Sequence, residues 1–132
     1  MNEAREHLAL DAGHPEPVAL GVTVLTSDVR TDAFDERVGW AKDAGCGGVV
    51  CAASEAARAR AVDMRAMVPG IRMPRQAADD QARVATPGEA IRAGADWILI
   101  GRAITRAEDP ESVAAAVAAD VESALRGGSR QG

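Results

Sequence analysis

Two segments of the chain, each placed just after an apolar run, carry residue types that bind anions. Arg72 follows a proline-glycine pair, and Gly101-Arg102 follows the apolar run 97–100. A guanidinium presents a planar fork of N–H donors that matches phosphate oxygens, and a glycine lets the backbone approach an anion closely. Gln81, between the two segments, adds a neutral amide donor. This combination predicts a site for a small anion such as a phosphate ester.

The chain has few residues of three other types that carry out catalysis or bind metals, namely lysine, cysteine and histidine. Lys42 is the only lysine, and its place in a helical pattern predicts a charge that faces water. Cys46 and Cys51 lie before and at the end of one apolar run without further ligands, so we expect reduced thiols. His7 and His14 lack the other ligands of a zinc site. We expect no bound metal.

The composition narrows the class of partner. A chain of 132 residues suits one domain, and two Trp with one Phe leave little aromatic surface for stacking bases. The net charge of −5 and the scattered basic residues argue against nucleic acid. No apolar stretch approaches the ~20 residues that span a bilayer, and the N-terminus carries no secretion signal. We therefore expect a cytoplasmic protein with a small-molecule partner, and neither nucleic acid nor membrane.

Short apolar segments alternate with alanine-rich helical stretches. The clearest of these segments lack polar alternation, which is typical of strands buried on both faces of a parallel sheet. Parallel pairing requires a crossover after each strand. The four expected strands are Leu20–Leu25, Gly48–Cys51, Arg65–Val68 and Trp97–Ile100.

Capping residues mark the intervening helices. Residues 33–44 place apolar side chains on one face, and Gly45 follows as a residue suited to a left-handed turn. Ser54 is expected to cap a helix that reaches about Val62. The sequence TPGE at residues 86–89 has the hydroxyl, proline and glutamate of a capping box.

The C-terminal part of the chain predicts a short and a long helix. Residues 103–107 can form one helical turn, and Asp109-Pro110 can begin a last helix. We expect residues 1–126 to form one domain and residues 127–132 to be a disordered tail. A core-facing stripe is expected at four-residue spacing, on Val113, Val117, Val121 and Leu125.

A series of strands and helices is compatible with an open doubly wound sheet or with part of a β/α barrel. In an open nucleotide-binding sheet the glycine fingerprint follows the first strand, but the segment 25–28 after the first strand has no glycine. The glycine-arginine segments follow the last two strands instead, where barrels keep their phosphate site. The loops therefore favour the barrel.

Seven ordered motifs span most of the chain: Leu25-Thr26-Ser27, Gly48-Val49-Val50-Cys51, Pro69-Gly70-Ile71-Arg72, Asp80-Gln81, Thr86-Pro87, Ala93-Gly94-Ala95-Asp96 and Ile100-Gly101-Arg102. In this order they resemble the C-terminal half of bacterial orotidine 5'-phosphate decarboxylases. The resemblance implies an α/β fold, namely half of a (β/α)₈ TIM barrel with four parallel strands and flanking helices. It also implies a usually homodimeric enzyme that converts orotidine 5'-monophosphate to UMP without metal or organic cofactor.

The resemblance assigns roles to six residues. Thr26 takes the place of a hydroxyl that meets the pyrimidine, and Pro69 would line the ligand. The phosphate-end contacts fall on Arg72, Gln81, Gly101 and Arg102.

The family's catalytic residues have no counterpart in this chain. In the family, an array of aspartate and lysine at the ends of early strands carries the chemistry, and a lysine protonates the carbanion left when carbon dioxide departs. Lys42 aligns instead with a surface helix position, so no catalytic residue is assigned.

Three functions remain open at this point. The first is a decarboxylase-family member that carries the phosphate- and pyrimidine-binding half. The second is a noncatalytic phosphate-binding half-barrel that self-associates, and the third is another phosphate-ligand barrel enzyme, such as a sugar-phosphate lyase or synthase. Four strands of an eight-stranded barrel leave unpaired edges and an open interior, so we expect association with a second copy or with a polypeptide that supplies the other half.

Overall fold

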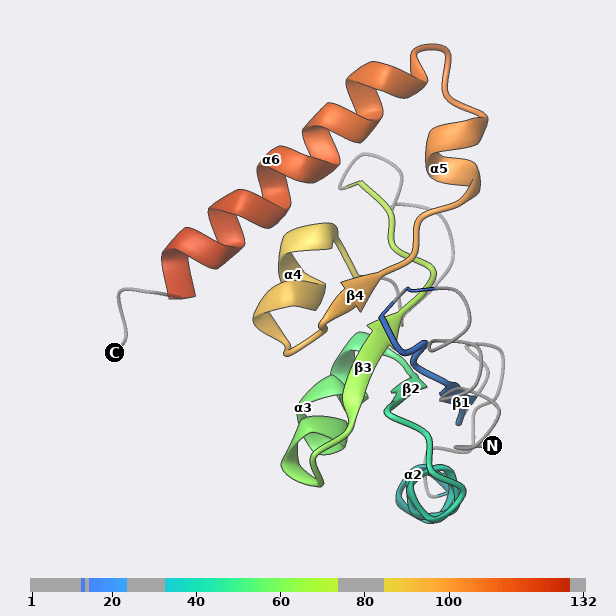
Figure 1. Ribbon diagram of the computed structural model, residues 1–132. Coiled ribbons are helices and arrows are strands. Elements are labelled where there is room, and N and C mark those ends of the chain that lie inside the picture. The colour runs from blue at the N-terminus through green and yellow to red at the C-terminus, as the bar shows by residue number, and fades with distance from the viewer. Residues whose placement is uncertain (1–12, 14, 24–32, 74–84, 129–132) are drawn as a thin grey trace.

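Four parallel strands form the centre of the structure, a computed structural model that describes residues 13, 15–23, 33–73 and 85–128 (Figure 1). The strands lie in the order β1-β2-β3-β4, and every neighbouring pair is parallel. Their bounds are Leu20–Val22, Gly48–Val50, Arg65–Val68 and Trp97–Ile98. The helices are α2 (Phe34–Asp43), α3 (Ala53–Ala61), α4 (Pro87–Arg92), α5 (Arg102–Thr105) and α6 (Pro110–Gly128). The four expected parallel strands with helical crossovers are thus confirmed.

The core lies between the sheet and the layer made by α2, α3 and α4. Val49, Ala66 and Val68 point from the strands into this layer and are at most 2% exposed. Phe34, at the start of α2, is 1% exposed in the same cluster. The helices contribute mainly alanine to this cluster, including Ala56, and small side chains let the helices approach the sheet closely.

The opposite face of the sheet is covered by none of the described helices. Val22, Val50, Met67 and Trp97 are paired in register across the four strands, so their side chains share this face. Leu99 follows two residues after Trp97 on the same side. We call these five residues the uncovered sheet face. Val22 is 63% exposed and Leu99 55%, so the expectation of strands buried on both faces is wrong within the described residues.

Two strands are shorter than expected, and the two residues that follow β3 explain why. The ladder of β2 with β3 ends at the bond from the Cys51 N–H to the Met67 oxygen, and that of β4 ends at the bond from the Leu99 N–H to the Val68 oxygen. Pro69 has no N–H, so it cannot donate the next bond of the β2–β3 ladder. The next donor of β3 on the β4 side would be Gly70, whose φ of +71° turns the chain out of the strand. The expected end of the first strand, residues 24 and 25, lies outside the described residues.

The helix boundaries show one correction at α3. Ser54 is exposed and lies inside the first turn, whereas Ala52 occupies the N-cap position. The Glu55 carboxylate accepts a hydrogen bond from the Ala52 N–H at 3.0 Å, so a side chain within the helix satisfies this donor without a hydroxyl cap.

The other predicted helix signals are confirmed. Thr86 Oγ1 accepts from the Glu89 N–H at 3.3 Å, and the Glu89 carboxylate accepts from the Thr86 N–H at 2.8 Å, which completes the capping box of α4. Gly45 has a φ of 81°, the left-handed conformation expected after α2. The short helix α5 begins one residue earlier than the predicted turn.

The long helix α6 packs along α4 but departs from its predicted stripe (Figure 1). Val113, Val117 and Val121 are half-buried, whereas Leu125 is 59% exposed and Ala124 is buried. A four-residue step turns a helix by about 400°, so three steps move a residue about 120° away from the starting face. The helix continues through Gly128, two residues into the segment expected to be disordered, and residues 129–132 lie outside the described part.

Candidate functional site

The segments that leave β3 and β4 meet at the carboxyl edge of the sheet. In a parallel sheet all strands point the same way, so loops after neighbouring strands lie side by side. The β3 segment includes Gly70 and Arg72, and the β4 segment includes Gly101 and continues into α5.

The segment after β3 is anchored on both sides of its turn. Gly70 adopts a φ of +71°, a conformation that residues with a Cβ rarely take. Ile71 then buries its side chain in the core, with 2% exposure. The Arg72 N–H donates to the Ala85 oxygen at 3.1 Å. These contacts fix the backbone of Arg72 while its half-buried side chain extends from the loop.

The segment after β4 is held by its own short helix. The Gly101 oxygen accepts from the N–H groups of Ile104 and Thr105 at 2.9 and 3.1 Å, and the Arg106 N–H donates to the Arg102 oxygen at 3.0 Å. A Cβ placed on Gly101 would meet no atom within 4 Å, so the backbone here faces open space.

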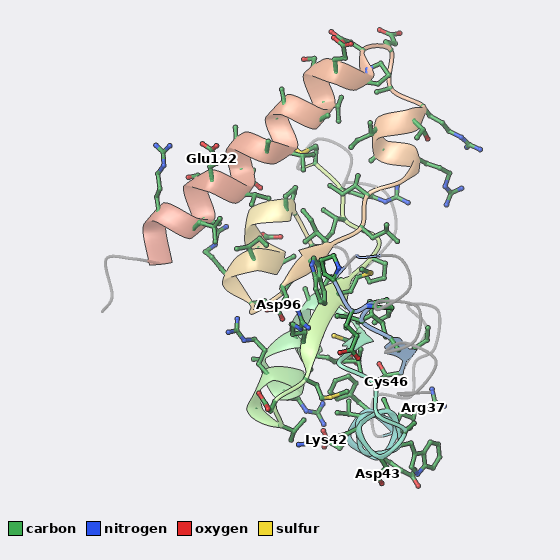
Figure 2. All side chains as sticks on the ribbon, in the orientation of Figure 1. Arg37, Lys42, Asp43, Cys46, Asp96 and Glu122 are labelled. Carbon is green, nitrogen blue, oxygen red and sulfur yellow. The ribbon has the colours of Figure 1, made fainter. Side chains whose placement is uncertain are left out.

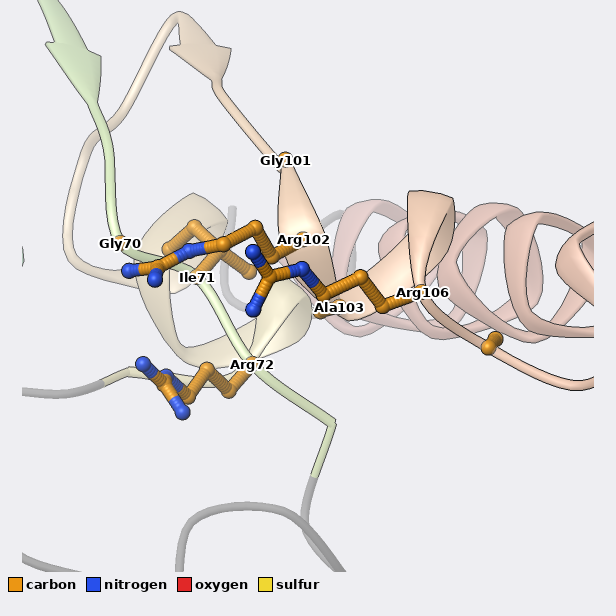
Figure 3. A pocket seen from close by; sticks show the side chains of 8 residues that line it. Gly70, Ile71, Arg72, Gly101, Arg102, Ala103 and Arg106 are labelled. Atoms are coloured by element: carbon orange, nitrogen blue, oxygen red, sulfur yellow. The ribbon is translucent and has the colours of Figure 1, made fainter.

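A cavity of about 480 Å³ lies between these two segments. Figure 3 shows the guanidinium groups of Arg72, Arg102 and Arg106 extending over it. The other lining residues are Gly70, Ile71, Gly101, Ala103 and Ala107. No acidic side chain occurs among these lining residues, and within the described part of the chain none of the three guanidinium groups has a carboxylate partner. Arginine stays protonated in proteins, so the described lining of the cavity carries three positive charges and suits an anion.

Three of the six predicted site residues come together in this cavity, namely Arg72, Gly101 and Arg102. Pro69 is half-buried and directly precedes Gly70, but it does not line the cavity. Its ligand contact stays a prediction. Thr26 and Gln81 lie outside the described residues, and their roles also stay predictions.

Arg106 is the site residue that sequence reasoning missed. It follows Arg102 by four residues, a spacing that places two side chains on the same side of a helix. The predicted turn begins at Ala103 and so leaves Arg102 outside the helix. The i,i+4 relation of the two arginines is recognised only when the helix includes Arg102.

Lys42 lies at the other end of the sheet from the cavity (Figures 1 and 2). Its exposed Nζ donates to the Val62 oxygen at 2.8 Å, at the C-terminal end of α3. The expectation of a surface charge on this helix is confirmed, and the contact gives Lys42 a role in ending α3.

Cys51 and Glu55 are buried titratable groups on the helix side of the sheet. Burial, and then the nearby Glu55 carboxylate, raises the pKa of the Cys51 thiol to about 12. Cys46 and Cys51 are both free thiols, as expected. A neutral thiol is a poor nucleophile, so Cys51 serves packing rather than chemistry.

The described residues form neither a metal-ligand cluster nor a membrane-spanning helix. Across residues 13, 15–23, 33–73 and 85–128, no three His, Cys, Asp or Glu side chains gather to hold a metal ion. Within the same ranges, no helix has the length and apolar character needed to cross a membrane.

Comparison with known proteins identifies the family. The model of the orotidine 5'-phosphate decarboxylase / HUMPS family matches residues 2–117. The chain belongs to this family. Among curated family members, the orotidine 5'-phosphate decarboxylase of Pseudomonas entomophila (strain L48) is 41% identical over 135 residues, which cover 92% of this chain and 58% of the relative. The enzyme of the same name from Methylobacterium sp. (strain 4-46) is 44% identical over 120 residues, covering 80% of this chain and 51% of the relative.

Solved structures agree with this family assignment. Orotidine 5'-phosphate decarboxylase from Lactobacillus acidophilus has a TM-score of 0.65 and 30% identity, over 83% of this chain and 51% of that one. The Sulfolobus solfataricus enzyme, at 22% identity and a TM-score of 0.64 over 94% of this chain and 56% of that one, shows the same fold. These relatives are TIM barrels, so the expected half-barrel is confirmed. The chain spans less than three fifths of the length of the P. entomophila relative.

Proposed function

We propose that this chain forms the phosphate-binding portion of an orotidine 5'-phosphate decarboxylase, which makes UMP in pyrimidine biosynthesis. The convergence of Arg72 and Arg102 on one cavity beyond β3 and β4 carries the proposal. The curated relatives named above bear the name of this decarboxylase, which favours it over a sugar-phosphate lyase or synthase.

In this proposal the two guanidinium groups hold the phosphate and leave the pyrimidine to extend over the strand ends. Arg72 and Arg102 approach from different loops, so together they fix both the position and the orientation of the phosphate. Gln81 would add an amide donor, while Thr26 and Pro69 would contact the rest of the nucleotide. Binding energy from a phosphate remote from the reacting carbon can be used to hold the substrate in its reactive geometry.

The chemical step needs a group that is not found among the described residues that line the cavity. Loss of carbon dioxide leaves a carbanion that must receive a proton, and a proton donor must lie within hydrogen-bond reach of that carbon. Lys42 donates to the Val62 oxygen at the opposite end of the sheet. We therefore propose that the chain binds the nucleotide and that turnover requires residues supplied by another polypeptide segment.

Calorimetric titration with UMP tests the binding proposal. Loss of a charged hydrogen bond costs about 1.5–3 kcal/mol, so Arg102→Ala is expected to weaken UMP binding by about 10- to 150-fold. Arg92→Ala is the matched control, because Arg92 is exposed in the last turn of α4 and does not line the cavity. Equal affinities for the wild type and Arg102→Ala, or no binding by the folded wild type, would contradict the proposal.

We also propose that the uncovered sheet face is an association surface, either for a second copy or for the remaining part of the barrel. Val22 lies in this face and is 63% exposed, which is costly for an apolar side chain in a row of others. Val22→Glu is expected to abolish association measured by sedimentation, whereas Val62→Glu, at a 43% exposed position directly after α3, is not. Mixing the chain with the N-terminal part of a relative distinguishes a second copy from the remaining part of the barrel as the partner. A monomer that unfolds cooperatively and captures no such partner would contradict the proposal.

A further inference from the structure

Arg106 gives the cavity a third guanidinium group, beyond the two that the family resemblance assigns to the phosphate. It is exposed, lines the cavity together with Arg72 and Arg102, and has no carboxylate partner among the described residues. Figure 3 shows its side chain running from the end of α5 over the same space.

The three positive charges of the cavity exceed in magnitude the negative charge of one phosphate monoester. A phosphate monoester carries about −1.5 to −2 charges near pH 7 and offers three acceptor oxygens. The two guanidinium groups of Arg72 and Arg102 would already balance the charge of one such group. A third guanidinium would remain uncompensated beside the other two, and like charges at i,i+4 on a helix repel. A ligand with one further ionised phosphate would relieve this repulsion.

The position of Arg106 suits contact with a second phosphate group rather than with the first one. The bond from its N–H to the Arg102 oxygen, at 3.0 Å, fixes its backbone one helical turn beyond Arg102. One turn advances about 5.4 Å along the helix axis, so the two side chains start from different depths along the cavity. Arg102 begins next to the open backbone of Gly101, and Arg106 begins farther from the strand ends.

We propose that Arg106 extends the phosphate site to a second phosphate group, so that this chain binds a nucleoside diphosphate more tightly than the corresponding monophosphate. The inference rests on the proposed function, because it takes the cavity of Arg72 and Arg102 as the site of the first phosphate. The second phosphate lies toward α5 and is held mainly by the Arg106 guanidinium.

Titration of the full chain with UMP and with UDP tests this inference. In the wild type, UDP is expected to bind about tenfold more tightly than UMP, the effect of one added charged contact. Arg106→Gln keeps most of the side chain and removes its charge. It is expected to weaken UDP binding about tenfold more than UMP binding, so that the UDP-to-UMP affinity ratio falls to about one. Arg92→Gln is the matched control and should leave both affinities unchanged.

The possible outcomes separate this inference from the proposed function. Preferential UDP binding that disappears in Arg106→Gln supports it. UMP binding that is lost in Arg102→Ala, together with a UDP-to-UMP ratio that Arg106→Gln does not alter, overturns the role of Arg106 and leaves the phosphate site standing. Absence of binding of both nucleotides to the folded wild type overturns both proposals.

Discussion

Removal of the Asp120 carboxylate is expected to destabilise the contact between α4 and α6. Asp120 Oδ2 accepts a hydrogen bond from the Gly88 N–H at 2.7 Å, in the first turn of α4. This bond satisfies an N–H that has no partner within its own helix, and it places a negative charge at the positive end of α4. The same contact holds α6, the helix that directly follows the segment carrying Arg102 and Arg106.

The magnitude follows from the geometry of this bond. A hydrogen bond to a charged group contributes about 1.5–3 kcal/mol, so Asp120→Ala is expected to lower the free energy of unfolding by about 2 kcal/mol. For a domain of this size, that loss lowers Tm by roughly 6–10 °C. Asp120→Asn keeps an acceptor oxygen but loses the charge, and should show about half of the effect.

Urea unfolding followed by circular dichroism measures these changes. Glu122→Ala is the matched control on the same helix, because Glu122 is exposed and its ion-pair partner among the described residues is the exposed Arg126, at 3.3 Å. Such an exposed i,i+4 pair contributes about 0.3–0.5 kcal/mol. Losses in Asp120→Ala and Glu122→Ala that agree within about 0.5 kcal/mol would refute the reasoning.

Gly88→Ala provides an independent check of the same contact. An added Cβ would lie 3.0 Å from both carboxylate oxygens of Asp120, so the carboxylate must move by a few tenths of an ångström to accept it. The substitution should therefore cost more in the wild type than in the Asp120→Ala background, where the carboxylate is gone. Strict additivity of the two substitutions would show that the residues do not interact.

Three further outcomes are expected. Iodoacetamide at pH 8 should modify Cys46 and spare Cys51, as mass spectrometry of the folded chain can show; equal modification would contradict the burial of Cys51. Because the Cys51 thiol ionises near pH 9 when unfolded and near 12 when folded, its contribution to stability is complete below pH 9 and lost between pH 9 and 12, at about 1.4 kcal/mol per pH unit. Cys51→Ala should remove that slope in urea unfolding, and an unchanged slope would exclude the thiol as its source. Phe34→Ala, at a site 1% exposed, should cost about 3–5 kcal/mol in the same assay. Trp40→Ala, at a site 60% exposed, should cost much less, and a similar loss at both positions would be inconsistent with the core described here.

Local signals in the sequence were sufficient for the order of the elements. The apolar run 48–50 predicts a strand, and the capping residues 86–89 predict the start of a helix. Each prediction uses only residues that are neighbours in the chain, and the structure contains both elements. The N-cap of α3 depended on a buried side chain, Glu55, whose contact with the Ala52 N–H replaced the expected hydroxyl of Ser54. Sequence spacing alone does not show that a carboxylate will be buried.

The site was predictable to the extent that it depends on the direction of the strands. Arg72 and Arg102 could be placed together because both follow parallel strands that end at the same edge. Arg106 depended on where α5 begins, a boundary set by the bonds to the Gly101 oxygen. Exposure of Leu99 depended on what covers the sheet, which is a property of tertiary packing and not of the apolar pattern.

Strand β4 pairs with β3 over a short length, so a ligand that contacts the ends of both strands would stabilise the sheet. Only two residue pairs, Met67 with Trp97 and Val68 with Ile98, join β4 to β3, and β4 is the outermost strand on that side of the described sheet. An anion that bridges Arg72 and Arg102 ties together the ends of these two strands. By mass action, a ligand at a hundredfold excess over its Kd adds about 2.7 kcal/mol to the folded state. If the proposed function is correct, a bound nucleotide holds the edge of the sheet in place, and the amide proton of Leu99 should exchange more slowly in its presence.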